Sequence, residues 1–526
     1  MAILPAIVVG GAWGALLSWL LGRYVIQAYV RRGTTLFGMA MVTIALGLVI
    51  QYTLEGIQGP TTRSYTVAHS RQYHLGAVVM SDLQLVIIGC AAVVMLAVHL
   101  LLRYTRLGLA MRATADDVEL CRGCGVSAER VRTVAWLVSG ALCGICGVFL
   151  GLGTGSFDAS IGGSLFVTIV AAAVTSSRGA SWSSCWRCAR RASSPSTPTA
   201  GNWSAERPGP MSEALQFYAS GVLVMLFINV IAVWGLDLQY GIAGIYNFAY
   251  VMFQAAGAYT AAVLALKPAS FYQAGQTYVG GFDLPFPLPL LGAAVAGGLL
   301  AVPVALIGLR RLRGDYQALA MLVLSLIATG YVRARTPLFN GVTGLSFIPA
   351  PLADALGLSR VAYQWCYAGL TALACGLVFL VMRGVTGSPF GRVLRAVRDS
   401  ETAAGALGRR ADRTRTVAFV LGGGLAGLSG GLLVQYVGAW APGSWTYPET
   451  FLIFTAVVVG GSGNLLGGVV GALLVPILII EGTRFLPEIG YPGLTASLDW
   501  VVMGLVLLAF LWWRPRGLAP ERRRRS

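Results

Sequence analysis

The sequence predicts an all-α polytopic membrane protein whose helices form two homologous halves in parallel repeat, with about 11 to 13 membrane segments. First, 56% of its 526 residues are hydrophobic and 11% are charged, with a mean hydropathy of +0.72. Soluble domains carry about a quarter charged residues. Second, apolar stretches near the roughly 20 residues that cross a bilayer recur along the chain. Third, a polar segment and the helix after it occur twice.

The candidate spans follow one another from the N-terminus. No cleavable signal peptide is evident, because the first apolar run lacks a basic leader and continues as a span. One run near the C-terminus is interrupted by glycines. In chain order the predicted spans are residues 2–22, 35–52, 82–102, 133–153, 213–234, 240–266, 287–309, 315–333, 361–382, 416–436, 451–482 and 497–513.

The charge distribution predicts which loops are cytoplasmic. The net charge of +17 would suggest nucleic acid in a soluble protein, but here the arginines lie beside the ends of apolar runs. That is the positive-inside pattern of membrane proteins, so we expect membrane lipid and no nucleic acid around the chain. The loops at 53–80 and 267–286 should face outward. The cytoplasmic side should hold Arg103–Arg132, Arg310–Gly314, Arg383–Arg415 and the tail "RPRGLAPERRRRS".

Three cysteine pairs have CxxC spacing, which can hold zinc or form a redox pair. They are Cys121 with Cys124, Cys143 with Cys146, and Cys185 with Cys188. The middle pair falls in an apolar helix, where small polarizable side chains are ordinary packing residues. We therefore expect no metal site and no cofactor.

The repeat keeps a constant offset of 283 residues. Gly108 falls on Gly391 and Asp116 on Asp399, and the register holds into the following apolar helix. About fifteen identities in about forty ungapped positions mark two homologous halves. Transporters are often built from repeated halves with a substrate site near their interface.

Each repeated loop contains a short amphipathic helical pattern, "LAMRATADDVELCRG" and "RVLRAVRDSETAAGA". It is too short and polar to span a membrane, and it could lie under the headgroups as an interfacial helix. Its presence in both halves favours a docking element for two equivalent partners. In the second half the predicted apolar face is Leu394, Val397, Ala403, Ala404 and Leu407, opposite Arg395, Arg398, Asp399 and Glu401.

The second half resembles LivM, a membrane permease of the ATP-driven branched-chain amino acid importers. The matching motifs are "QYGIAGIYNFAYVMFQAAGAYTAAVLA" from Gln239, "LRRLRGDYQALAMLVLSLI" from Leu309, "FNGVTGLSFIP" from Phe339, "GSPFGRVLRAVRDSETAAGALG" from Gly387 and "VVVGGSGNLLGGVVGALL" from Val457.

The first half resembles the sister family LivH from "LGRYVIQAYVRRGTTLFGMAMVTIALGLVIQ" to about Val174, but it departs from the pattern twice. Nothing before Met1 matches "YGIAGIYNFAYVMFQAAGAYTA". After "SLFVTIVAAAVT" the chain reads "SSRGASWSSCWRCARRASSPSTPTAGNWSAERPGP", which has no apolar period and could not cross lipid. We predict a LivH-like half at 1–175 without its usual first and last segments, and a LivM-like domain at 211–526.

Residues 176–210 between them have two interpretations. They could be a flexible cytoplasmic linker between fused permeases. We favour a frame slip in the gene, after which Met211 looks like the start of an independent permease.

The resemblance implies a permease of an ATP-binding-cassette importer in the bacterial plasma (inner) membrane. It implies two ATPase subunits and an extracytoplasmic binding protein as partners. The chain itself has no P-loop, which needs a lysine at the phosphates, because its single lysine is Lys267 at a helix end. The repeated loops would be the helices that contact the ATPases, through Arg112, Asp116 and Glu119 in the first half and Arg395, Asp399 and Glu401 in the second.

The translocation path and its outer mouth are expected in the second half. The turn-rich "FNGVTGLSF" lies on the side away from the arginines, where a binding protein would dock, although it could equally be a structural turn. The glycines at 422–424, 427, 430–431, 460–461, 463 and 467–468 should let helices pack closely. The candidate residues are Asn247, Phe248, Asn340, Gly341, Thr343 and Gly344.

Other substrates and mechanisms stay open. Relatives of this family take branched-chain amino acids, urea, short amides or other small polar solutes. An ion-coupled secondary transporter would place ionisable groups inside its spans, and few occur: His99 and Asp499 lie near span ends, and Glu213 and Asp237 flank one. A membrane enzyme is disfavoured, because no His/Asp cluster of the metal-binding type appears.

Overall fold

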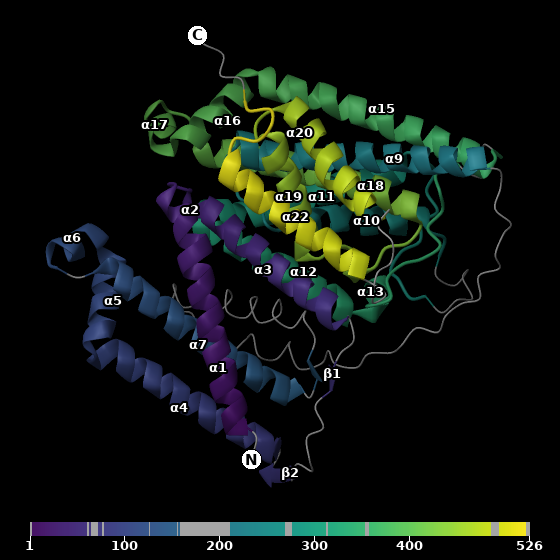
Figure 1. Ribbon diagram of the computed structural model, residues 1–526. Coiled ribbons are helices and arrows are strands. Elements are labelled where there is room, and N and C mark those ends of the chain that lie inside the picture. Colours follow the sequence, from purple (N-terminus) through teal and green to yellow (C-terminus); the bar gives the residue numbers. More distant parts are fainter. Residues whose placement is uncertain are drawn as a thin grey trace. The chain divides into compact units, whose positions relative to one another are not determined.

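The computed structural model describes residues 3–59, 63–64, 72–75, 78–125, 127–154, 156–157, 211–268, 276–311, 314–352, 357–484 and 494–521. The chain divides into two compact units (Figure 1). The first is Met1–Ser164 with Gly490–Ser497, and the second is Leu165–Ile489 with Leu498–Ser526. The segment 176–210, with Cys185 and Cys188, lies outside the described residues.

The described chain is almost entirely helical, and it is polytopic as predicted. Two shorter apolar helices, Tyr250–Ala265 and Ser497–Trp513, accompany ten helices that are long and apolar enough to cross a membrane. The ten are Pro5–Arg31, Phe37–Ile57, Gln84–Tyr104, Ala128–Gly153, Glu213–Ile242, Leu288–Leu309, Gln317–Ala334, Arg360–Gly387, Ala411–Val437 and Leu465–Thr483.

The first unit is built on two helices that touch along glycines. A Cβ on Gly14 would lie 2.3 Å from the carbonyl oxygen of Gly140, so α1 and α7 can pack this closely because neither has a side chain there. The helices of this unit are α1 (Ile3–Leu20), η1 (Leu21–Ile26), α2 (Gln27–Arg31), α3 (Leu36–Gln58), α4 (Asp82–Tyr104), α5 (Arg106–Asp116), α6 (Val118–Gly123) and α7 (Ala128–Thr154).

Short strands occur in the loop at 53–80 of the first unit, which the sequence did not predict. β2 (Gln72–Leu75) and β3 (Val78–Ser81) form an antiparallel hairpin. β1 (Arg63–Ser64) pairs antiparallel with β4 (Ser156–Phe157), the strand that follows α7. This second pairing ties the loop at 53–80 to the end of α7.

The second unit is organised around α18 (Ala411–Val437), against which α10 and α11 pack. A Cβ on Gly297 of α11 would lie 2.4 Å from the carbonyl oxygen of Gly423, which gives the predicted glycines their packing role. The other elements up to α18 are α9 (Met211–Asp237), η3 (Leu238–Ile242), α10 (Tyr250–Ala265), α11 (Leu288–Arg311), α12 (Gly314–Ala334), α13 (Thr336–Phe339), α15 (Arg360–Gly387), α16 (Pro389–Asp399) and α17 (Glu401–Ala406).

The glycine-broken run near the C-terminus is two helices joined by a turn. α19 (Tyr447–Gly460) follows the short η5 (Pro442–Ser444), and it ends where Gly461 and Gly463 adopt positive φ angles of 111° and 81°. α20 (Leu465–Ala472), η6 (Leu473–Ile479) and α21 (Ile480–Arg484) come next, and α22 (Leu494–Trp513) ends the helical part.

The direction of α9 bears on the segment that precedes it. The hydroxyl of Ser220 donates to Oε1 of Gln364 at 3.0 Å, and the rings of Trp234 and Phe379 lie 5.6 Å apart. Helices α9 and α15 therefore run parallel, and the start of α9 lies at the opposite end of the unit from α16. If α16 is cytoplasmic, residue 211 is extracytoplasmic.

The repeat is reproduced element by element. The bounds of α5, α6 and α7 match those of α16, α17 and α18 with every residue number displaced by 283. The caps match as well, since Thr105 Oγ1 accepts from the amide of Gly108 at 3.1 Å and Ser388 Oγ accepts from that of Gly391 at 3.3 Å. Equal local chemistry at equal spacing therefore produces the same local structure twice.

Each loop contains two helices where the amphipathic pattern predicted one. Ser400, with φ of −158°, is extended and caps α17, just as Asp117 with φ of −150° lies between α5 and α6. This break changes the helical phase. Leu394, Val397 and Ala404 are buried as predicted, whereas Ala403 and Leu407 are exposed.

Candidate functional site

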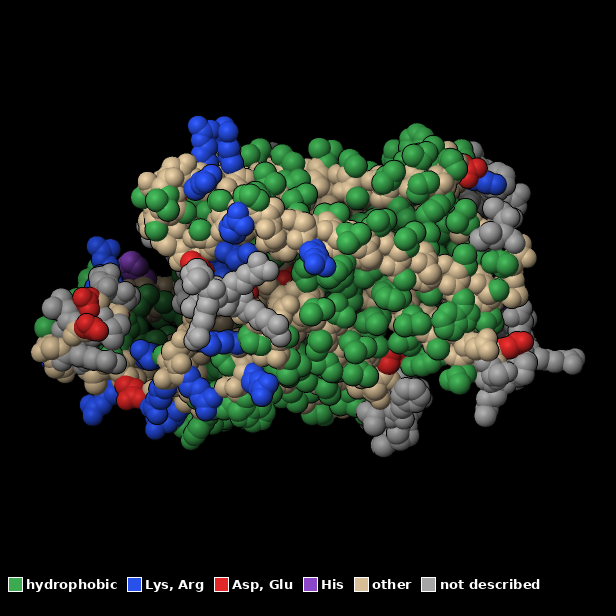
Figure 2. Space-filling model, turned by 90° about the horizontal axis from the view of Figure 1, so that it is seen from above, with side chains coloured by type: hydrophobic (Ala, Val, Ile, Leu, Met, Phe, Trp, Pro, Cys, Tyr) green, Lys and Arg blue, Asp and Glu red, His purple; other side chains and the backbone are tan. Residues whose placement is uncertain are grey.

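The repeated loop of the second unit carries the best-defined polar site. Figure 2 shows hydrophobic side chains over much of the surface in view, with the Lys and Arg side chains mostly toward one side of the picture. Within this loop, some charged residues form ion pairs inside the unit, and others are exposed on its surface.

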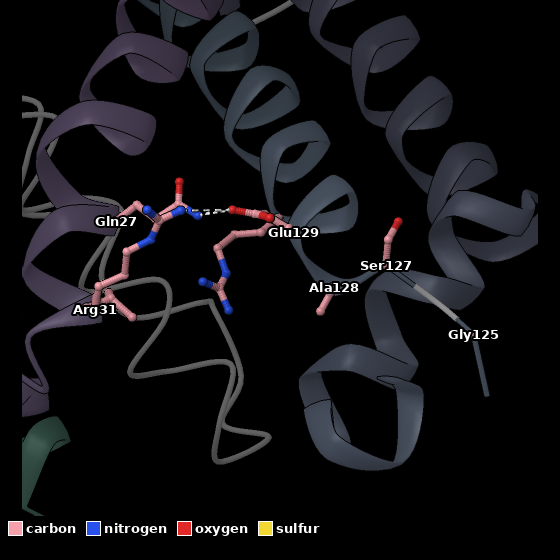
Figure 3. Close-up of a pocket in the computed structure, with 8 residues that line it drawn as sticks. Gln27, Arg31, Gly125, Ser127, Ala128 and Glu129 are labelled. Atoms are coloured by element: carbon pink, nitrogen blue, oxygen red, sulfur yellow. Dashed lines mark hydrogen bonds and ion pairs between the residues drawn. The ribbon is translucent and has the colours of Figure 1, made fainter. Parts of the chain in front are cut away.

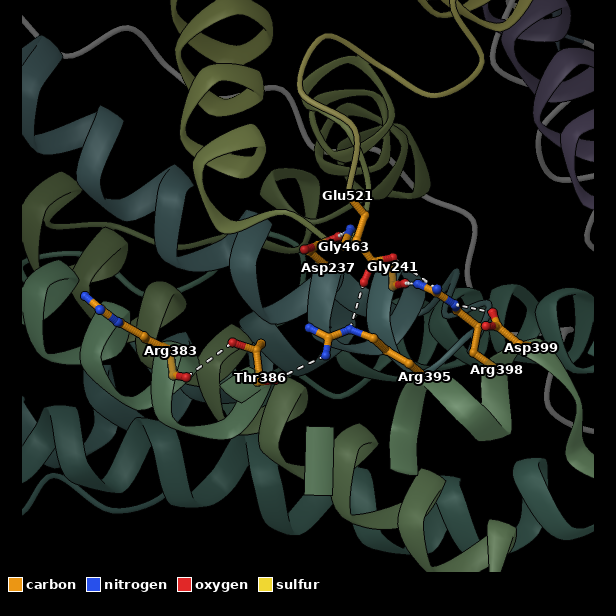
Figure 4. Close-up of polar contacts among 9 residues, drawn as sticks. All are labelled: Asp237, Gly241, Arg383, Thr386, Arg395, Arg398, Asp399, Gly463 and Glu521. Atoms are coloured by element: carbon orange, nitrogen blue, oxygen red, sulfur yellow. Dashed lines mark hydrogen bonds and ion pairs between the residues drawn. The ribbon is translucent and has the colours of Figure 1, made fainter. Parts of the chain in front are cut away.

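Arg395 and Arg398 of α16 share one carboxylate, that of Glu521 in the C-terminal tail (Figure 4). Arg395 Nε lies 2.7 Å from Glu521 Oε1, and Arg398 Nη2 lies 3.0 Å from Glu521 Oε2. The three side chains are each about a quarter to a third exposed. Ion pairs that are partly withdrawn from water are screened less than exposed pairs. The pairs of this triad therefore stabilise the position of α16 more than a surface ion pair would.

Arg398 also reaches the end of α9. Its Nη1 donates to the carbonyl oxygen of Gly241 in η3, and its Nε lies 3.3 Å from Asp399 Oδ1. Burial lowers the pKa of the Arg398 guanidinium, but the charges and hydrogen bonds of Glu521 and Asp399 outweigh burial and hold that pKa above its ordinary value. Arg398 stays charged and links α16 to η3.

Asp237 lies next to this group, at the end of α9 (Figure 4). It is 1% exposed, and its Oδ1 accepts from the amide of Gly463 at 2.7 Å. The sequence placed Asp237 beside a span, where it counted against an ion-coupled carrier. The structure shows that Asp237 holds the turn between α19 and α20.

Three residues of the loop face outward. The Asp399 side chain is 70% exposed, Leu407 at the end of α17 is 82% exposed, and Glu401 is about half exposed while it pairs with Arg415 at 2.7 Å. An exposed leucine beside exposed acids suits a protein partner better than it suits headgroups. Among the predicted contact residues, Asp399 and Glu401 are therefore accessible, whereas Arg395 is engaged with the tail.

The equivalent loop of the first unit has the same helices but different side-chain contacts. Arg112, which corresponds to Arg395, is exposed, and Ala115 stands in the place of Arg398. Glu119 is exposed, and its amide donates to Asp117 Oδ1 at 2.8 Å. The side chain of Asp116 lies outside the described residues.

A surface pocket of about 570 Å³ lies beside the start of α7 in the first unit (Figure 3). Its polar contacts are made by Glu129, whose Oε1 accepts from Gln27 Nε2 at 2.5 Å and lies 3.3 Å from Arg31 Nη2. Arg31 and Glu129 are well exposed, so this pair is weak. The other lining residues are Val30, Gly125, Ser127, Ala128 and Arg132.

The predicted outer-mouth turn is held by its own hydrogen bonds. Asn340, at the left-handed φ of 61°, donates from Nδ2 to the carbonyl oxygen of Gly344 at 2.9 Å. Leu345 exchanges two backbone hydrogen bonds of 2.8 Å with Trp440, in the loop after α18. Gly341 is buried, whereas Thr343 is exposed. The turn is thus a structural element with an exposed tip.

The two path candidates in the broken segment before α10 are fully buried. The amide of Asn247 donates to Gln239 Oε1 at 2.7 Å and accepts from the backbone of Ala249 at 3.0 Å. The ring of Phe248 lies 5.0 Å and 5.3 Å from those of Phe451 and Phe454. In this conformation both side chains pack in the core of the second unit.

The cysteines of the described chain are all free, and no metal-type group of three or more His, Cys, Asp or Glu occurs among the described residues. Cys143 and Cys146 are exposed on the apolar helix α7. In an apolar helix of this length, exposed positions can face lipid.

The sequence analysis does not predict a role for Glu521. Arginines dominate the tail, and one glutamate among them carries no periodic signal. A usable signal was the net positive charge of α16, which needs an acidic partner wherever it is withdrawn from water.

Comparison with known proteins assigns the same family to two segments of the chain, as the internal repeat predicts. The family model described as "Branched-chain amino acid transport system / permease component" matches residues 1–180 and 218–511. The chain is 28% identical over 322 residues to the high-affinity branched-chain amino acid transport system permease protein LivM of Escherichia coli K12, covering 57% of this chain and 70% of LivM.

Two further relatives are matched over nearly the whole of their own length. The probable LivM permease of Methanocaldococcus jannaschii is 26% identical over 331 residues, covering 58% of this chain and 93% of the relative. The LivH permease of Escherichia coli K12 is 25% identical over 311 residues, covering 56% and 92%. No solved structure matches the chain.

Proposed function

Because the chain belongs to the permease-component family of branched-chain amino acid transport systems, we propose that it forms the transmembrane path of an ATP-binding-cassette importer for branched-chain amino acids. The chain is a multi-pass permease of the plasma membrane. In the proposed importer, an extracytoplasmic binding protein delivers the substrate. Two separate ATPase subunits supply the energy, and the chain itself catalyses no hydrolysis.

The observation that carries the ATPase part is the duplicated two-helix loop. Helices α5–α6 and α16–α17 have identical lengths and matching caps at an offset of 283 residues. Each is too short to span the membrane, and the second exposes Asp399, Glu401 and Leu407. Two equivalent non-spanning elements suit two equivalent soluble partners.

In this proposal the loops act as levers. ATP-driven closure of the ATPases would displace α16 and α17, and the docked partners must favour one helix arrangement over the other for transport to be coupled. Asp399, Glu401 and Leu407 would contact the ATPase, and electrostatic complementarity would set the register of that contact. The exposed Arg112 and Glu119 would do the same on the first loop, together with Asp116.

The experiment is reconstitution of the full chain with ATP-binding-cassette ATPases and a binding protein encoded beside its gene. We expect co-purification of the ATPases, and uptake of radiolabelled leucine that requires ATP and is reduced by excess isoleucine and valine. Competition by urea or short amides instead of these amino acids would assign a different substrate. Uptake that follows a proton or sodium gradient without ATP would contradict the importer.

The domain organisation belongs to the same proposal. We propose a LivH-like half at 1–175 and a LivM-like domain at 211–526, joined by a segment that contributes no helix to the path. Resequencing the gene between codons 170 and 215 tests the frame slip. A reading frame that restores "GSGN"-like residues after Val174 supports it, and an unchanged frame contradicts it.

A further inference from the structure

The C-terminal tail folds back onto the turn between α19 and α20. The amides of Leu518 and Ala519 donate to the carbonyl oxygens of Val459 and Gly460, each at 2.9 Å. Asn464 Nδ2 donates to the carbonyl oxygen of Ala519 at 3.1 Å. The tail thereby satisfies the carbonyl groups that α19 leaves open at its end.

The approach is so close that it depends on glycine. A Cβ on Gly461 would lie 2.4 Å from the carbonyl oxygen of Ala519, and one on Gly517 would lie 2.5 Å from Gly461 Cα. Both glycines have positive φ angles, 111° and 72°, which other residues adopt poorly. The close contact between the turn and the tail therefore requires glycine on both sides.

Glu521 extends the contact from the turn to α16. It follows shortly after Ala519, whose amide pairs with the end of α19, and its carboxylate receives both arginines of α16 (Figure 4). On the other side of the turn, Asp237 at the end of α9 holds the amide of Gly463. Four elements, α9, α16, the turn and the tail, therefore meet around one cluster.

The charges in this cluster are paired through Glu521. The guanidinium groups of Arg395 and Arg398 share the carboxylate of Glu521, and the side chain of Asp399 adds a partner for Arg398 at the exposed rim. Removing the charge of Glu521 would leave two neighbouring cations on α16 without their shared anion. Such a change should push α16 away from the turn and loosen the tail's hold on the turn, even though Asp237 still accepts from the amide of Gly463.

The first unit does not repeat this arrangement on its own loop. The position of Arg398 is Ala115 there, and the equivalent of Arg395, Arg112, is exposed. The ion pairs between α16 and the tail are thus specific to the second loop. The two-helix motif does not need them, because it forms in the first unit without them.

We propose that Glu521 is a positioning residue that fastens α16 to the turn between α19 and α20, so that a displacement of α16 is transmitted to α19, α20 and the end of α9. This inference rests on the proposed function, because it assumes that an ATPase displaces α16. Arg395 then serves transmission inside the permease, and the contact with the ATPase falls to Asp399, Glu401 and Leu407.

The test compares three variants of the full chain. Glu521→Gln removes the charge at nearly constant size, and Glu521→Asp keeps the charge. Asp412→Asn is the matched control, because Asp412 is an exposed carboxylate in the first turn of α18. Size-exclusion profiles in detergent establish that each variant is folded and monodisperse.

The first measurement needs no partner. Hydrogen exchange of the solubilised chain should be several-fold faster in Glu521→Gln over residues 389–399 and over 461–464. Exchange should be close to wild type in Glu521→Asp and in Asp412→Asn. Unchanged exchange in Glu521→Gln over these two segments would overturn the proposal, whatever the ATPases do.

The second measurement uses the reconstituted importer. In Glu521→Gln, transported leucine per ATP hydrolysed should fall about tenfold while the ATPases still co-purify, and Glu521→Asp should restore most of the ratio. An unchanged ratio would reduce Glu521 to a structural contact and overturn the transmission step. If no ATPase binds the wild-type chain, the proposed function fails and transmission fails with it, while the exchange data still decide whether Glu521 fastens α16.

Discussion

Gly257 of α10 and Gly427 of α18 lie backbone against backbone: a Cβ on Gly257 would be 2.2 Å from the carbonyl oxygen of Gly427. Side-chain atoms essentially never approach a carbonyl so closely, so any larger residue here forces the two helices apart. The contact lies at the centre of the second unit, where α10 and α11 both pack on α18.

Gly257→Ala is therefore expected to destabilise the second unit by about 1–3 kcal/mol, the usual cost of overpacking a tight core. The measurement is the unfolding midpoint of the purified chain in detergent. Gly376→Ala on α15 is the control, because a Cβ there meets nothing within 4 Å. Equal midpoints for the two variants would show that the α10–α18 contact is looser than the structure indicates.

Ser388→Ala is expected to loosen the start of α16. The hydroxyl of Ser388 accepts from the amide of Gly391, and losing such an N-cap costs about 1 kcal/mol. Amides in the first turn of α16 should exchange about fivefold faster, since local opening sets their protection. Ser388→Thr, which reproduces the Thr105 cap of the first unit, should exchange like wild type. If alanine behaves like threonine, the cap does not hold this helix.

Leu407→Asp is expected to weaken ATPase co-purification by tenfold or more while the permease stays folded, because it would place a charge in the apolar contact that the docked ATPase buries. Leu358→Asp is the control at the opposite end of the unit, where an exposed leucine precedes α15. Cys124→Asp makes the equivalent change just after α6, because Cys124 is exposed and corresponds to Leu407. Loss of binding in both Leu407→Asp and Cys124→Asp indicates two working loops, and loss in Leu407→Asp alone indicates one. Binding unaffected by either change contradicts the docking assignment.

Reversing the acids of α16 and α17 tests the same surface electrostatically. Asp399→Arg with Glu401→Arg should release the ATPase or uncouple ATP hydrolysis from uptake, because it reverses the charge of the surface that contacts the ATPase. The new arginine at position 401 would also repel Arg415, the ion-pair partner of Glu401. ATPase retention is measured by co-purification, and coupling by uptake per ATP hydrolysed. Wild-type values for both would leave the loop as an interfacial helix.

The outer turn yields a prediction that separates structure from recognition. Gly344→Ala should prevent correct folding of the turn, because φ is +74° and a Cβ would lie 2.3 Å from the carbonyl oxygen of Trp440. Val342→Asp, on the 71% exposed tip, should leave folding intact. It should raise the binding-protein concentration needed for half-maximal uptake severalfold. Unchanged uptake by Val342→Asp and by Thr343→Ala would confine the turn to a structural role.

The all-helical class and the repeat followed from the sequence because both depend on local properties. A span needs a certain length of apolar residues, and the pairs Thr105–Gly108 and Ser388–Gly391 are capping signals within three residues of each other. Local rules were less successful at Ser400. One extended residue there broke the predicted helix in two and exposed Leu407.

The sequence by itself determined that this protein crosses the membrane many times and that two of its loops are copies, since hydropathy and the 283-residue offset are properties of the chain read in order. Only the tertiary structure decided how the charges are used. Arg395 and Glu521 are separated by more than a hundred residues, and no periodic pattern connects them. They meet because α22 returns the tail to the glycine turn after α19, where two cations partly withdrawn from water require an anion.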